Sequence, residues 1–122
     1  GETAKGTIEK LKEVLGDARV EIKETGNTFE PSPVTSTQSY GFKTTQEICA
    51  KVFPDAIVTP FLMIGGTDSK HFETISESLI RCLPVRMNKD QLHTIHGVNE
   101  RVGVKDFMET IEFYKTLITD LK

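Results

Sequence analysis

Two short stretches of the sequence carry residue types that can do chemistry, and the first is Gly65-Gly66-Thr67-Asp68-Ser69. Paired glycines after an apolar run allow a sharp turn and a close approach of the backbone to a ligand. Thr67 or Asp68 can cap a following helix, whose first amide groups can bind a carboxylate. The same residues also suit a purely structural turn between a strand and a helix, so both interpretations stay open.

The second stretch runs from His93 to Glu100 and contains two histidines, an asparagine and a glutamate. Neutral imidazole is a common zinc ligand, and a neighbouring polar group often holds the ring in place. His96 is the candidate ligand, and Asn99 and Glu100 are candidates for shaping its loop. A catalytic zinc site needs about three protein ligands, so a solvated polar loop without metal is the other interpretation.

The two cysteines are predicted to be small thiols packed inside the protein rather than nucleophiles. Cys49 falls in a predicted helix and Cys82 in a predicted buried strand, and no positioned base is visible beside either. Two cysteines do not make a disulfide framework, and they fit a reducing compartment, so we expect a cytoplasmic protein.

The composition excludes two classes of partner. The chain has 122 residues, with 15 basic and 18 acidic side chains and a net charge of −3, so it lacks the positive charge that nucleic acid requires. No apolar run approaches the ~20 residues of a membrane span. The length suits one ordinary domain.

Hydrophobic spacing predicts the elements that must position these residues. Helices are predicted at 3–15, 36–52 and 104–121, with a short helix after the glycine pair. Strands are predicted at 18–23, 56–64 and 79–83, and the nearly continuous apolar run 56–64 is typical of a strand buried on both faces. Residues 85–103 are predicted to form a long loop. This order favours an α/β fold in which helices cover a sheet, with both reactive stretches beyond the carboxyl ends of strands.

The last predicted helix shows the clearest pattern. Its apolar residues recur at helical spacing along one stripe. The stripe consists of Val104, Phe107, Met108, Ile111, Tyr114, Leu117, Ile118 and Leu121.

A stiff connector divides the chain. Pro31 and Pro33 each fix their own backbone and bias the preceding residue away from helix. The residues before them form only one helix and one strand, which is too little to bury a core alone. We therefore predict a boundary here, with residues 1–30 a piece of something larger.

Taken in order, several motifs resemble the end of a known family. They are Gly65-Gly66-Thr67-Asp68-Ser69-Lys70-His71-Phe72, then Arg81 and Pro84, then Ile95-His96-Gly97-Val98-Asn99-Glu100 and a terminal amphipathic helix. The family is the dinuclear zinc metallopeptidases that include aminoacylase, carboxypeptidase S, glutamate carboxypeptidase and succinyl-diaminopimelate desuccinylase. The carboxypeptidase S branch is the most similar, because its last metal histidine lies in a His-Gly-x-Asn-Glu stretch.

The resemblance implies a role for each part. Residues 1–30 would be the last helix and strand of a lid domain that also makes dimer contacts, and residues 31–122 the C-terminal part of the catalytic domain with its mixed sheet. His96 would be the final zinc ligand. Gly66 and Thr67 would meet the carboxylate or carbonyl oxygen of a peptide or N-acyl amino acid substrate. Two zinc ions and a glutamate base would hydrolyse the amide bond.

The other zinc ligands and the general base of that family have no counterpart here, so no catalytic residue is assigned to this chain. The sequence is therefore predicted to be a fragment, inactive alone, that binds zinc weakly or not at all and self-associates through an exposed face. The alternative is a free-standing small α/β module that binds a ligand or a partner.

Overall fold

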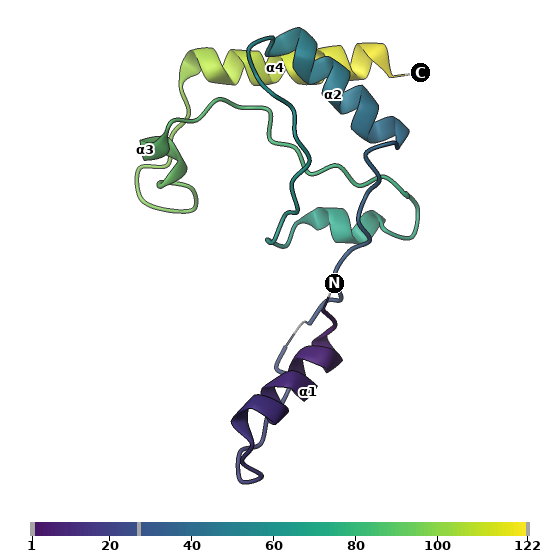
Figure 1. Ribbon diagram of the computed structural model, residues 1–122. Coiled ribbons are helices and arrows are strands. Elements are labelled where there is room, and N and C mark those ends of the chain that lie inside the picture. Colours follow the sequence, from purple (N-terminus) through teal and green to yellow (C-terminus); the bar gives the residue numbers. More distant parts are fainter. Residues whose placement is uncertain (1, 27, 122) are drawn as a thin grey trace. The chain divides into compact units, whose positions relative to one another are not determined.

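The computed structural model describes residues 2–26 and 28–121. Their regular structure is helical throughout, with elements α1 (Ala4–Leu15), α2 (Tyr40–Val52), the 3₁₀ helix η1 (Asp68–Phe72), α3 (Lys89–Leu92) and α4 (Val104–Asp120) (Figure 1). The chain divides into two units, Gly1–Pro33 and Val34–Lys122. Across the described residues, none of the helices is both long and apolar enough to cross a membrane.

In the first unit, local capping explains the limits of α1. The Thr3 side chain accepts a hydrogen bond from the Gly6 amide at 3.0 Å and so satisfies one of the free amides of the first turn. Gly16 ends the helix with φ at 58°, a left-handed conformation that glycine adopts without strain. The helix predicted at 3–15 is thus confirmed.

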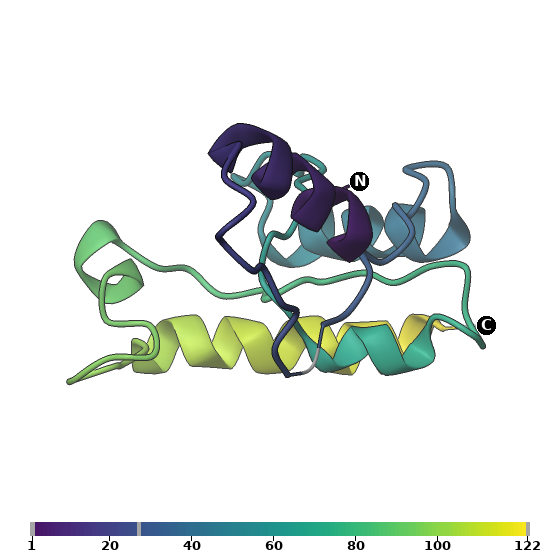
Figure 2. The same ribbon diagram turned by 90° about the horizontal axis from the view of Figure 1, so that it is seen from below.

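In the second unit, α2 packs against α4 and forms the core (Figures 1 and 2). The Ser39 side chain caps α2 by accepting from the Phe42 amide at 3.3 Å, so this helix begins later than the predicted residue 36. Three apolar side chains are buried between the two helices, and three others pack partly against them. The buried ones are Ile48, Phe53 and Phe113, and the others are Cys49, Val52 and Leu117.

A charged bridge reinforces one end of this helix pair. Arg86 Nε donates to Glu109 on α4 at 2.8 Å, and the Arg86 guanidinium also donates to Asp55, just after α2. The same guanidinium lies 5.2 Å from the centre of the Phe53 ring, within range of a cation–π interaction. Hydrogen bonds from Arg86 hold the pKa of Asp55 below its ordinary value.

The predicted mixed sheet is absent from the described residues, and this corrects the α/β prediction. Segments 18–23, 56–64 and 79–83 lie in irregular chain without strand pairing. In the run 56–64, Ile57 is 92% exposed and Ile64 is 97% exposed, although this run was predicted to be buried on both faces. A strand forms only when neighbouring strands satisfy its backbone groups, and the described residues supply no such neighbour.

The helix predicted at 104–121 is confirmed as α4, but its apolar stripe is largely uncovered in the described structure. Most of its members are exposed, whereas Phe113, which is not on the stripe, is only 2% exposed. The physical reason is that α2 is the one helix that packs on α4 in the described structure, and it covers a different side. The predicted stripe thus lacks a covering layer.

The Thr35 side chain forms hydrogen bonds with both backbone groups of Leu79. Thr35 Oγ1 accepts from the Leu79 amide at 2.9 Å and donates to the Leu79 carbonyl at 3.1 Å. These two hydrogen bonds fix the beginning of the segment 79–83, which leads directly to Arg81.

Candidate functional site

The glycine pair lies in an exposed turn before η1. The Thr67 side chain caps η1 by accepting from the Ser69 amide at 3.3 Å. Neither Gly65 nor Gly66 has a positive φ, and a methyl group added to Gly66 would meet no atom within 4 Å. A residue with a side chain would therefore fit at Gly66, and the local turn does not explain why glycine is present there.

Arg81 joins this turn to the segment 79–83. Its Nε donates to Thr67 Oγ1 at 3.0 Å and to Ser69 Oγ at 2.7 Å. The Thr67 and Ser69 hydroxyls also form a hydrogen bond with each other. We name Thr67, Ser69 and Arg81 the hydroxyl cluster. It places a cation and two hydroxyl groups directly beside the glycine pair.

The loop that carries His96 is held by local hydrogen bonds. It follows α3, which begins with a capping box in which Asn88 and Gln91 satisfy each other's backbone amides. His96 has φ at 59° and Asn99 has φ at 61°, so two non-glycine residues of one short loop are left-handed. The His96 amide donates to Glu100 Oε2 at 3.1 Å. Histidine and asparagine are among the residues that adopt this conformation most readily, and the Glu100 contact fixes the backbone at His96.

The structure does not bring the two candidate stretches together. Both views show α3 and the loop after it well away from the teal helical segment around η1 (Figures 1 and 2). His96 is exposed, and within residues 2–26 and 28–121 no three histidine, cysteine or acidic side chains converge as a metal site requires. Among the described residues, His96 is thus not part of a converging set of three candidate ligands.

The two cysteines differ in their exposure to solvent. Cys49 is half-buried, whereas Cys82 is exposed as a residue, which corrects the prediction that it is buried. The two thiols share a hydrogen bond. Loss of water around the Cys82 sulfur, followed by repulsion from Cys49, raises the pKa of Cys82 from 9.0 to about 11. Cys82 is thus a neutral thiol at pH 7 and not an activated nucleophile.

This pKa leads to a testable pH dependence. Because the thiolate is the reactive form, the rate at which iodoacetamide alkylates Cys82 should rise with pH up to about 11. In the variant Cys49→Ala the midpoint should move down toward 9.0, since both effects of Cys49 raise the pKa of Cys82. Peptide mass spectrometry after timed quenching measures the rate. If the alkylation rate of Cys82 in the unaltered chain has its pH midpoint at or below 9, the contact between the two thiols is contradicted.

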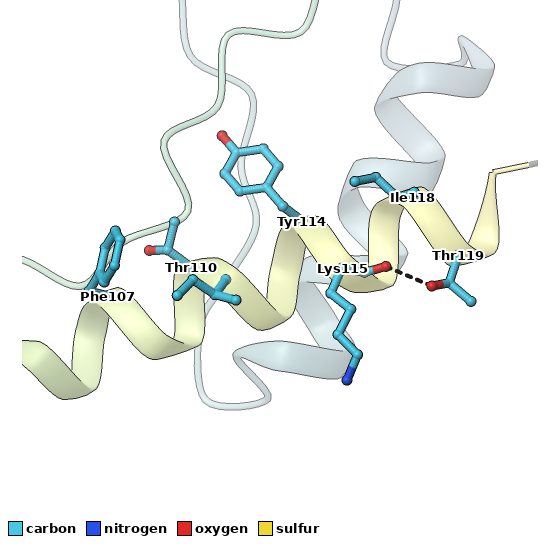
Figure 3. A pocket seen from close by; sticks show the side chains of 7 residues that line it. Phe107, Thr110, Tyr114, Lys115, Ile118 and Thr119 are labelled. Atoms are coloured by element: carbon cyan, nitrogen blue, oxygen red, sulfur yellow. Dashed lines mark hydrogen bonds between the residues drawn. The ribbon is translucent and has the colours of Figure 1, made fainter.

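A shallow pocket runs along α4 (Figure 3). All of its lining residues belong to this one helix, so it is an open apolar face rather than an enclosed binding cavity. Its polar groups are largely occupied, as in the hydrogen bond that Thr119 Oγ1 donates to the Lys115 carbonyl at 2.8 Å. The lining consists of Phe107, Thr110, Ile111, Tyr114, Lys115, Ile118 and Thr119.

Sequence reasoning missed the hydroxyl cluster as a unit. Arg81 was noted only as part of a motif, and Ser69 received no role. The signal was present, because Arg81 is a charged residue inside the apolar run 79–83. A charge in such a run needs a partner, and the Thr67 and Ser69 hydroxyls provide it.

Comparison with known proteins finds relatives whose names state hydrolase activities. It is 34% identical over 97% of its length to a probable carboxypeptidase S-like 2 of Dictyostelium discoideum. It is 29% identical over 97% of its length to the N-fatty-acyl-amino acid synthase/hydrolase PM20D1 of Homo sapiens, and 31% identical over 92% to an uncharacterized carboxypeptidase of Schizosaccharomyces pombe. These results confirm the predicted resemblance.

The chain spans 23%, 24% and 19% of the lengths of these three relatives. No family model matches it, and no solved structure matches it with statistical significance.

Proposed function

We propose that this chain, a relative of the carboxypeptidase S-like and N-fatty-acyl-amino acid synthase/hydrolase proteins, is the C-terminal quarter of a zinc-dependent amidohydrolase. The substrates would be peptides or N-acyl amino acids. The observation that carries the proposal is the similarity over nearly the whole chain to proteins whose names state amide-bond chemistry. The motif order from the glycine pair to the terminal helix supports the C-terminal position.

In this proposal the chain's own residues bind and position. His96 contributes one zinc ligand, while Glu100 and Asn99 shape its loop, and the Glu100 contact to the His96 amide supports that role. Gly66 and Thr67 contact the substrate. The remaining ligands and the general base would belong to the rest of the protein, since no three candidate ligands converge within the described residues.

The exposed apolar segments support the proposal that this chain is part of a larger α/β domain. Runs 56–64 and 79–83 become strands of a mixed, helix-covered sheet once the neighbouring strands of the longer protein are present. Residues 1–30 would then be the remnant of the lid domain, and residues 31–122 the end of the catalytic domain. The division of the chain at Pro33 is compatible with that boundary. Self-association through an exposed face and a cytoplasmic location are further parts of the proposal.

The free-standing ligand-binding module is less well supported. Its best candidate site is the pocket along α4, and a pocket lined by a single helix leaves most of a ligand exposed to water.

The decisive experiment compares two purified proteins, the 122-residue chain and the full-length protein that contains it. Both are incubated with N-dodecanoyl-L-phenylalanine and with a dipeptide, and released amino acid is measured by mass spectrometry. The full-length protein should hydrolyse at least one substrate in a manner that a zinc chelator abolishes, and the 122-residue chain should show no turnover. Turnover by the short chain, or none by the full-length protein, would contradict the proposal.

A further inference from the structure

The chain from Ser78 to Arg86 is attached to the α2 region at both of its ends. At one end the Ser39 and Ser78 hydroxyls form a hydrogen bond at 3.0 Å. At the other end the Arg86 guanidinium donates to Asp55, just after α2, at 2.9 Å. This stretch of chain therefore runs alongside the helix and in the same direction.

The two cysteines lie between these attachments and meet there. Cys49 is ten residues after Ser39, which corresponds to a helical rise of about 15 Å. Cys82 is four residues after Ser78, which can span at most about 14 Å. The two lengths nearly match, and the thiols share a hydrogen bond. The attached backbone thus brings the two sulfur atoms together.

The protonation of the thiols bears on what this contact can do. Loss of water around the sulfur raises the pKa of both Cys49 and Cys82, so both are neutral at pH 7. A disulfide is easily reduced when the protein stabilises the resulting thiolates. These thiolates receive no such stabilisation, so the contact suits a lasting disulfide rather than a catalytic thiol pair.

We propose that Cys49 and Cys82 form a redox modification site, at which a small-molecule disulfide oxidises the two thiols to one intramolecular disulfide. The thiolate of the exposed Cys82 attacks one sulfur of the small disulfide, forms a mixed disulfide and releases one small thiol. The Cys49 thiolate then attacks Cys82 Sγ and releases the second small thiol. The protein loses two electrons and two protons, and the small disulfide takes up both.

The modification would change how firmly the segment 79–83 is held. The new bond joins positions 33 residues apart and ties this segment covalently to α2. A cross-link of this kind stabilises a fold mainly by restricting the unfolded chain. The oxidised chain should therefore be the more stable form of the second unit, and this expectation does not depend on the proposed function.

The test uses the 122-residue chain, in which these are the only two cysteines. The chain is equilibrated at about pH 8 with mixtures of reduced and oxidised glutathione, once in buffer and once in concentrated urea. Intact mass after acid quenching distinguishes the dithiol, the mixed disulfide and the intramolecular disulfide. The equilibrium constant for the intramolecular disulfide should be about 10–1000-fold larger in buffer, because the fold holds the thiols together.

The unfolding midpoint gives a second measurement. Oxidation should raise the urea midpoint by about 1–2 M. Cys49→Ser is the matched control, because its reaction should stop at the mixed disulfide on Cys82 and its midpoint should hardly change.

Two results would overturn the proposal. One is an equilibrium constant that is no larger in buffer than in urea, and the other is a mixed disulfide that persists as the main product of the unaltered chain. Neither result affects the proposed hydrolase, which the comparison of the short chain with the full-length protein tests separately.

Discussion

Replacing His96 by asparagine in the full-length protein should abolish hydrolysis and remove one equivalent of zinc. A metal ion lowers the barrier of such reactions by several kcal/mol, so loss of a ligand should reduce kcat/KM by roughly 10³-fold or more. Asparagine is the informative substitution because His96 has φ at 59°. Asparagine tolerates this left-handed conformation, whereas alanine is strained there.

Two measurements check this prediction, zinc content by atomic spectrometry and turnover of an N-acyl amino acid. His93→Asn is the matched control, since His93 is an exposed histidine three residues earlier. It should keep its zinc and nearly all of its activity. If His96→Asn retains both zinc and turnover, His96 is not a ligand and the central residue of the proposed site is lost.

Replacing Phe113 by alanine should unfold the second unit of the 122-residue chain. Phe113 is 2% exposed between α2 and α4, and truncation of a buried phenylalanine costs about 3–5 kcal/mol. Whole domains are stable by only about 5–15 kcal/mol, and the hydrophobic core of this unit has just three buried members among the described residues. Urea unfolding followed by circular dichroism should show a much lower midpoint or no cooperative transition.

Ile118→Ala provides the control on the same helix, because Ile118 is 74% exposed. Its midpoint in the 122-residue chain should hardly move. In the full-length protein the same change should become costly, because a helix that covers the proposed sheet would bury its apolar stripe, to which Ile118 belongs. If Ile118→Ala changes the urea midpoint equally little in both proteins, the proposal that the chain is a fragment is contradicted. If Phe113→Ala leaves the midpoint unchanged, the described core is contradicted.

The sequence predicts local structure well where local interactions decide it. The helices α1 and α4 follow from apolar periodicity together with the stop signal at Gly16, and their predicted and observed bounds nearly coincide. The beginning of α2 was missed by four residues because Ser36 and Ser39 both resemble caps, and only Ser39 bonds to the helix amide.

Long-range structure could not be predicted in the same way. Alternation and apolar runs identify a segment that suits a sheet, such as 56–64, but they do not supply its neighbours. On α4 the pattern identified an apolar stripe, yet α2 packs on the side that contains Phe113. At the candidate site, the residue types of Thr67 and His96 were visible in the sequence. The tie from Arg81 to Thr67 and Ser69 spans 14 and 12 positions, and spacing in the sequence does not reveal it.

The exposed run 56–64 has a consequence for how the protein is made. It contains no charged residue, and only Pro60 interrupts it, so Phe61–Ile64 resembles the short uncharged segments from which intermolecular β-aggregates grow. Under the proposed function its partner strands lie earlier in the polypeptide and leave the ribosome first, so the run meets them as it emerges. A ribosome that translates these 122 residues alone releases the run without those partners, and inclusion bodies are the expected product.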